Sequence, residues 1–321
     1  MRDNPSVGTC DEYGVSGITS FDDLAEARRK IAESHPGFKP LFSLDDLHQA
    51  RYTSGHVRNN LGMDDASEQE IAGLPPECFE NGEYIGYPTT KEEFAICLRN
   101  FMTLVAATSF EDACTHGLTL DQQALQEWIG YQNNPISLLE QPLSALLVPV
   151  QQSCQALAAF PNGYFTSDLD PAKNFAVARH FSEAHGYELM GVGASYIGFI
   201  RAEPPDTSLA NVVAKDFCAL FNTSDENLQE RVSKVAQAIS GRTHLWLRWT
   251  SSDNKNAAQL AATRYKGSHD GIFGLSDPWH KGTLGNRSAA DHCVTNFAVQ
   301  IITYGVKNPF ESDLKIGPLG K

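Results

Sequence analysis

Long hydrophobic runs and clusters of positive charge are both missing from this sequence. No stretch approaches the roughly 20 apolar residues that a membrane-spanning helix needs. The chain has 25 Lys and Arg residues against 39 Asp and Glu residues, a net charge of −14, and no basic run exceeds Arg28-Arg29-Lys30. Such an acidic chain repels phosphate backbones and anionic lipids. We therefore expect neither nucleic acid nor a membrane among its partners.

Paired cysteines and a secretory signal are also absent. The seven cysteines are an odd number without a Cys-x-x-Cys pair, and Cys97 and Cys218 lie in apolar runs typical of reduced core thiols. The first residues, MRDNPSVGTCDEYG, contain no apolar segment of the signal-peptide kind. Because thiols stay reduced in reducing compartments, the sequence predicts a cytoplasmic protein without disulfides.

Several common catalytic motifs are missing as well. The chain has no Gly-x-x-x-x-Gly-Lys-Ser/Thr phosphate loop, no Gly-x-Ser-x-Gly and no set of protein-kinase motifs. Gly191-Val-Gly193 lacks the third glycine of a dinucleotide-binding fingerprint. These absences count against ATPase, serine-hydrolase and dinucleotide-binding functions, and they leave the cofactor unknown.

Helix signals are abundant in the first part of the chain. Its 321 residues, 41% of them hydrophobic, suffice for a large core. Ser20 precedes a helical pattern that predicts a helix over 21–34, and Thr90 with Glu93 forms a capping box that predicts a helix over 91–107. We therefore expect a mainly helical region over 1–160.

Strand signals concentrate in the second part, 161–321. Aromatic and β-branched residues predict strands near 187–201, 243–250 and 294–306. Helical patterns lie between them. The predicted fold class is α+β, with α/β as the alternative: a mainly helical N-terminal part packed on a C-terminal part that contains a mixed sheet.

The segment from Leu147 to Trp249 has a recognisable order of parts. It comprises the apolar start Leu147-Val148-Pro149-Val150, a helix ending near Gly186, a glycine-containing strand over 191–199, the run Arg201-Ala-Glu-Pro-Pro205 before another helix, and a closing strand rich in tryptophan. In this order the segment 147–250 resembles an uncharacterised bacterial family defined by a domain of unknown function. That resemblance implies no established reaction, cofactor or catalytic residue.

The stretch 264–296 combines histidine, cysteine and glycine in an otherwise helix-patterned chain. A metal site needs three or four converging ligands, and the spacing here matches no standard zinc pattern. A cysteine nucleophile needs a histidine base and a group that orients it. The candidate metal ligands are His269, His280 and His292, and the candidate catalytic residues are His269, Asp270, His280 and Cys293. Hydrogen-bonding histidines on a glycine-rich loop are the plainer interpretation.

Aromatic and arginine side chains suggest a recognition function for residues 245–296. Arginine binds carboxylates and phosphates through its planar fork, and tryptophan with arginine is enriched at binding hot spots. The candidate ligand-binding residues are Trp246, Arg248, Trp249, Arg264 and Trp279. Buried tryptophans are the alternative explanation.

Three functions follow from these patterns. The leading one is a binding protein that recognises a protein partner or a small anionic ligand through residues 245–296. The first alternative is a metal- or cysteine-dependent hydrolase or transferase that uses His269, His280 and Cys293. The second is a structural subunit of a larger assembly, and a homo-oligomer stays open.

Overall fold

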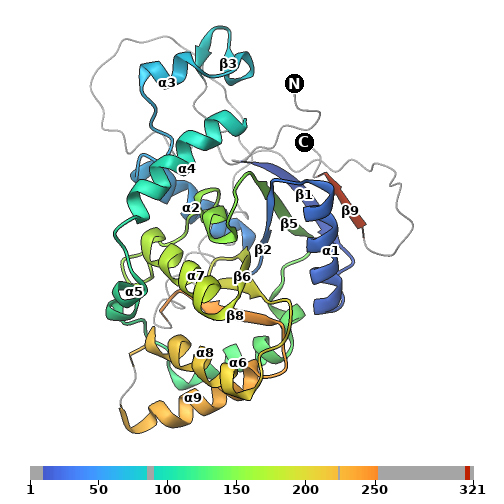
Figure 1. Ribbon diagram of the computed structural model, residues 1–321, viewed down its shortest axis with the longest axis vertical. Coiled ribbons are helices and arrows are strands. Elements are labelled where there is room, and N and C mark those ends of the chain that lie inside the picture. Colours follow the sequence, from blue (N-terminus) through green and yellow to red (C-terminus); the bar gives the residue numbers. More distant parts are fainter. Residues whose placement is uncertain (1–9, 85–89, 223–224, 252–314, 319–321) are drawn as a thin grey trace, which may run out of the picture. The chain divides into compact units, whose positions relative to one another are not determined.

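Seven of the described strands form one mixed β-sheet (Figure 1). The structure is a computed structural model that describes residues 10–84, 90–222, 225–251 and 315–318. The sheet has the strand order β8-β7-β6-β2-β5-β1-β9, and β2 and β6 are its one parallel pair among the described strands. The strands are β1 (Asp11–Ser16), β2 (Lys39–Ser43), β5 (Leu143–Val148), β6 (Glu188–Val192), β7 (Tyr196–Ile200), β8 (His244–Arg248) and β9 (Lys315–Pro318).

Helices and short elements make up most of the remaining described chain. The α-helices are α1 (Phe21–Ser34), α2 (Leu47–Asn60), α3 (Glu68–Ala72), α4 (Lys91–Val105), α5 (Phe110–His116), α6 (Gln122–Asn133), α7 (Pro171–His185), α8 (Thr207–Ala219) and α9 (Asp225–Ile239). The short elements are the 3₁₀ turns η1 (Pro76–Cys78), η2 (Pro135–Leu138) and η3 (Ser153–Ala158) and the two-stranded ribbon of β3 (Phe79–Glu80) and β4 (Glu83–Tyr84). Ser20 and Thr90 each form a complete capping box, so α1 and α4 begin where the sequence predicts.

The predicted α+β class is confirmed. Strands β6 and β7 occur within the predicted 187–201, and β8 occurs within 243–250. The predicted strand over 294–306 lies outside the described residues. The division of the chain near residue 160 stays a prediction, and strands from both sides of this position share the sheet because β1, β2 and β5 pair beside β6.

The described residues also bear on membrane-spanning helices and on disulfides. No helix there combines the length and the apolar character needed to cross a membrane. The described cysteines are all free thiols, and they are Cys10, Cys78, Cys97, Cys114, Cys154 and Cys218.

Strand β8 lies at one edge of the sheet, and α6 supplies hydrogen bonds to its backbone. Trp128 donates from Nε1 to the carbonyl oxygen of Trp246 at 2.5 Å. Gln132 donates from Nε2 to the carbonyl oxygen of His244 at 2.9 Å and accepts from the backbone N–H of Trp246 at 3.0 Å. These side chains occupy groups that a further strand would otherwise pair with. They therefore fix α6 along the sheet edge.

The Trp246 ring packs directly against the backbone of Gly198, where there is no room for a side chain. A Cβ atom at Gly198 would lie 2.5 Å from Cζ3 of Trp246, which is fully buried. Gly198→Ala should lower the free energy of unfolding by about 1–3 kcal/mol, because overpacking forces strain on a close-packed core. Gly130→Ala is the matched control, since Gly130 is in α6 and a Cβ there would meet no atom within 4 Å. Urea denaturation should show the control gaining about 0.5–1 kcal/mol, and equal stability of the two variants would contradict this packing.

His244 should make the fold sensitive to acid. Burial lowers the pKa of His244 to about 4, and its Nε2 lies 2.8 Å from the carbonyl oxygen of Gln132. An unfolded histidine has a pKa of about 6.5, so between that pH and 4 only the unfolded state takes up the proton. Stability is therefore full above the unfolded pKa and is lost as the pH falls, by on the order of 3 kcal/mol from this residue. Denaturation measured from pH 7 to 4 should show a shallower decline in His244→Asn than in the wild type, and parallel declines would show that His244 contributes nothing.

Candidate metal centre

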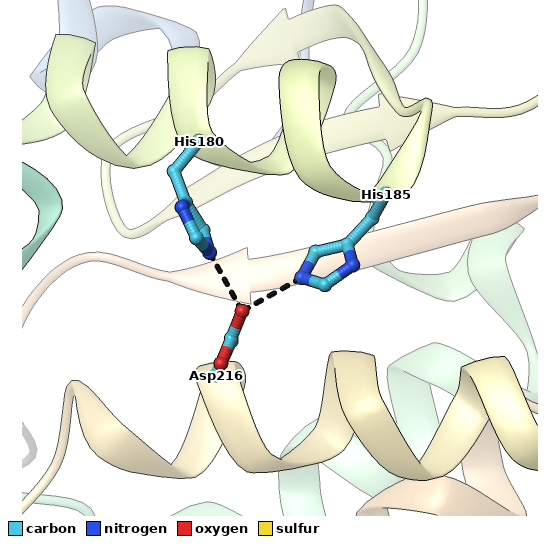
Figure 2. A group of neighbouring side chains, drawn as sticks. All are labelled: His180, His185 and Asp216. Atoms are coloured by element: carbon cyan, nitrogen blue, oxygen red, sulfur yellow. Dashed lines mark hydrogen bonds and ion pairs between the residues drawn. The ribbon is translucent and has the colours of Figure 1, made fainter.

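Two histidines of α7 and an aspartate of α8 converge on one point (Figure 2). Nε2 of His180 lies 2.6 Å from Oδ2 of Asp216, and Nε2 of His185 lies 2.8 Å from the same oxygen. One donor atom from each of the three residues lies within 4.8 Å of the others. Figure 2 shows both imidazoles pointing from α7 toward Asp216, which points back from α8. One carboxylate oxygen thus accepts a hydrogen bond from each ring.

Local sequence signals set the ends of α7 and so place the histidines. Asp170 caps the start of α7 by accepting from the backbone N–H of Lys173, ahead of a proline at the first helical position. Gly186 ends the helix with a φ of 70°, a left-handed conformation that glycine adopts without strain. His185 is therefore the last helical residue. His180 lies five residues earlier, and both rings reach Oδ2 of Asp216.

The centre is open on one side and closed on the other. The side chains of His180 and Asp216 are 28% and 29% exposed, whereas that of His185 is 3% exposed. Phe110 of α5 stacks on the His180 ring, with centroids 3.9 Å apart and planes 6° from parallel. Phe181 packs against the His185 ring at 5.5 Å. Aromatic rings therefore hold both imidazoles in place while the exposed side leaves a path from solvent.

The protonation state of His185 suits a metal ligand. Burial lowers its pKa, and the hydrogen bond to Asp216 opposes that shift only in part. The ring is therefore neutral at pH 7, which is the form that binds metals. As a donor to Asp216 through Nε2–H, His185 leaves Nδ1 without a proton, and this buried nitrogen has no hydrogen-bond partner. Two imidazole nitrogens and one carboxylate oxygen form a donor set for zinc and similar divalent transition metals.

The three residues of this centre lie within a segment that matches a protein-family model. Residues 144–250 match the family described as Domain of unknown function (DUF4253). The predicted resemblance to an uncharacterised family over 147–250 is thereby confirmed. The DUF4253 segment begins in β5, ends after β8, and contains His180, His185 and Asp216. Comparison with the curated proteins gave no match, and comparison with the solved structures gave none either.

Three predicted ligand-binding residues lie at the end of the DUF4253 segment and are buried. Trp246, Arg248 and Trp249 are 0%, 3% and 2% exposed. Arg248 donates from Nε to the carbonyl oxygen of Thr250 at 3.0 Å and lies over the Tyr196 ring at 5.9 Å. The side chains thus pack within the fold, as the alternative explanation of buried tryptophans expects. Their role in ligand binding stays a prediction.

The other predicted site residues lie outside the described ranges. They are the ligand-binding candidates Arg264 and Trp279, the catalytic candidates His269, Asp270, His280 and Cys293, and the metal candidate His292. Their functions stay predictions as well.

His180, His185 and Asp216 are not among the site residues predicted from the sequence. A spacing of five residues does not place two side chains on one face of a helix, so it is not a ligand pattern that a sequence displays. The third residue belongs to another helix, beyond two strands. The one available signal was a pair of histidines in the last part of a predicted helix.

Proposed function

We propose that the DUF4253 segment binds a divalent transition-metal ion between α7 and α8. The ligands are Nε2 of His180, Nε2 of His185 and the carboxylate of Asp216. The observation that carries the proposal is the convergence of both Nε2 atoms on Oδ2 of Asp216, at 2.6 and 2.8 Å. Two imidazole nitrogens and one carboxylate oxygen, all within 4.8 Å of one another, make up a donor set that zinc accepts.

Entry and exchange of the ion are supported by the partial exposure of His180 and Asp216. His180 and Asp216 are partly exposed and offer the first contacts, whereas His185 lies deeper and is held neutral by burial. Binding at Nε2 requires each neutral imidazole to carry its proton on Nδ1 instead. The ion then replaces two N–H donors as the partner of the carboxylate. Three protein ligands leave one position of a tetrahedral zinc ion free.

A metal-dependent function was also an alternative predicted from the sequence, but its candidate ligands were His269, His280 and His292. Recognition of a protein partner or a small anionic ligand through residues 245–296 stays a prediction, as does a role as an assembly subunit. A cytoplasmic location also belongs among the proposals, and the free thiols of the described residues support it. The net charge of −14 supports the absence of a nucleic-acid partner.

Zinc binding by the full chain tests the proposal. After treatment with a chelator, the wild type should take up one zinc ion per chain and gain about 3 kcal/mol of stability at a zinc concentration of 100 times Kd. Asp216→Asn and His180→Ala should each lose most of this uptake and of the shift in Tm. His48→Ala, which changes an exposed histidine of α2, is the matched control and should behave as the wild type.

Metal analysis after desalting and differential scanning calorimetry give the two readouts. Undiminished zinc uptake by Asp216→Asn would place the ion on other residues and contradict the proposal. Absence of uptake by the wild type would leave the three side chains as a hydrogen-bonded group only, and would contradict it equally.

A further inference from the structure

A polar cleft lies between η3, α7 and the first residues of β2 and β6, and none of its lining residues is a ligand of the proposed metal ion. The cleft has a volume of about 160 Å³. Pockets for larger ligands have volumes of about 300–1,000 Å³ and mainly apolar walls. Here every lining residue except Cys154 is polar or charged. The size and the lining therefore suit a small polar molecule.

A hydrogen bond and an ion pair hold two walls of the cleft in place. The side chain of Ser153 in η3 accepts from the backbone N–H of Leu189 at 3.0 Å, which joins η3 to β6. Glu188, the first residue of β6, pairs with Arg28 of α1 at 2.6 Å. A site whose walls are fixed in this way needs little further ordering when a ligand binds.

One face of α7 forms a further wall. Arg179, Ser182 and Glu183 line the cleft, and residues three and four apart share one face of a helix. Arg179 donates from Nη2 to the carbonyl oxygen of Thr108 at 3.1 Å, so a neutral group anchors its guanidinium. The cleft also contains Cys154, where burial raises the pKa of the thiol, Glu183 raises it further and Arg179 lowers it. Both charges of α7 therefore act on the interior of the cleft.

Three charged side chains of the cleft form no ion pair with any residue that the structure describes. They are Lys39, Arg179 and Glu183. Lys39 and Glu183 have opposite charges and line the same cleft, yet they do not pair with each other. The remaining charged residue of the lining, Glu188, is compensated by Arg28. The cleft thus presents two positive charges and one negative charge to a ligand.

We propose that this cleft binds a small zwitterion of the α-amino-acid class. The carboxylate of the ligand lies against Lys39 and Arg179, and its ammonium group donates to the carboxylate of Glu183. Hydrogen bonds between charged groups are stronger than those between neutral groups. A ligand with a carboxylate alone leaves Glu183 without a counter-charge, and a ligand with an amine alone leaves both cations without one. A zwitterion compensates the charges of both signs.

The site draws on more than the DUF4253 segment. Its lining residues in η3, α7 and β6, and the two residues before η3, lie within 144–250, whereas Lys39 belongs to β2. Strand β2 pairs in parallel with β6, which brings the starts of both strands to the same side of the sheet. The full chain is therefore the form to test. Metal-free protein is suitable, because the proposed ligand contacts none of the three metal-binding side chains.

Isothermal titration calorimetry of the metal-free full chain with each standard L-amino acid tests the proposal. At least one should bind with one molecule per chain. For that amino acid, the analogue without the amino group and the analogue without the carboxylate should each bind about tenfold more weakly, because each leaves a charge in the cleft unpaired. Absence of binding by every amino acid would overturn the proposal, as would an analogue that binds as tightly as its parent.

Charge-neutralising variants then locate the ligand. Glu183→Gln and Lys39→Met should each weaken binding of the amino acid about tenfold. Glu203→Gln and Lys215→Met are the matched controls, since both residues are exposed and neither lines the cleft, and they should bind as the wild type does. Undiminished affinity in either cleft variant would place the ligand elsewhere and overturn the proposal.

Discussion

The shared hydrogen-bond acceptor, Oδ2 of Asp216, is the constraint on which the centre depends. It pairs with an imidazole that is almost completely buried and with another that is partly exposed. Without this oxygen, the buried Nε2–H of His185 would lose its partner, and an unsatisfied buried donor costs about 1–3 kcal/mol. The same oxygen brings the ends of α7 and α8 together. A cation therefore finds its ligands already gathered, and the ordering of those side chains does not have to be driven by binding.

The sheet explains why α7 and α8 meet at this point. Helix α7 leads through Gly186 into β6, β6 pairs with β7, and β7 leads into α8, so a single hairpin connects the two helices. Phe181 of α7 stacks on Phe199 of β7, with centroids 5.6 Å apart, and fixes the helix on the sheet. At the sheet edge, Trp128 and Gln132 secure β8. The centre thus lies on a helix that packs against the sheet.

Helices that begin with a side-chain cap could be predicted from the sequence, because the cap and the backbone group that it binds are close in the chain. Ser20 and Thr90 cap α1 and α4, and the strand composition near 187–201 matches β6 and β7. The centre could not be predicted in this way, because its histidines and Asp216 become neighbours only through tertiary packing. The same limit applies to Trp246, whose combination with Arg248 and Trp249 in the sequence suggested recognition. Its burial depends on α6, more than 100 residues earlier in the chain.

The central claim is that His180, His185 and Asp216 hold one metal ion, and anomalous diffraction tests it most directly. Crystals of the zinc-loaded protein, measured above and below the zinc absorption edge, should give one strong anomalous peak between both Nε2 atoms and the Asp216 carboxylate. The ligand distances should be about 2.0–2.2 Å. A peak only at other residues, with both imidazoles still hydrogen-bonded to Asp216, would contradict the account.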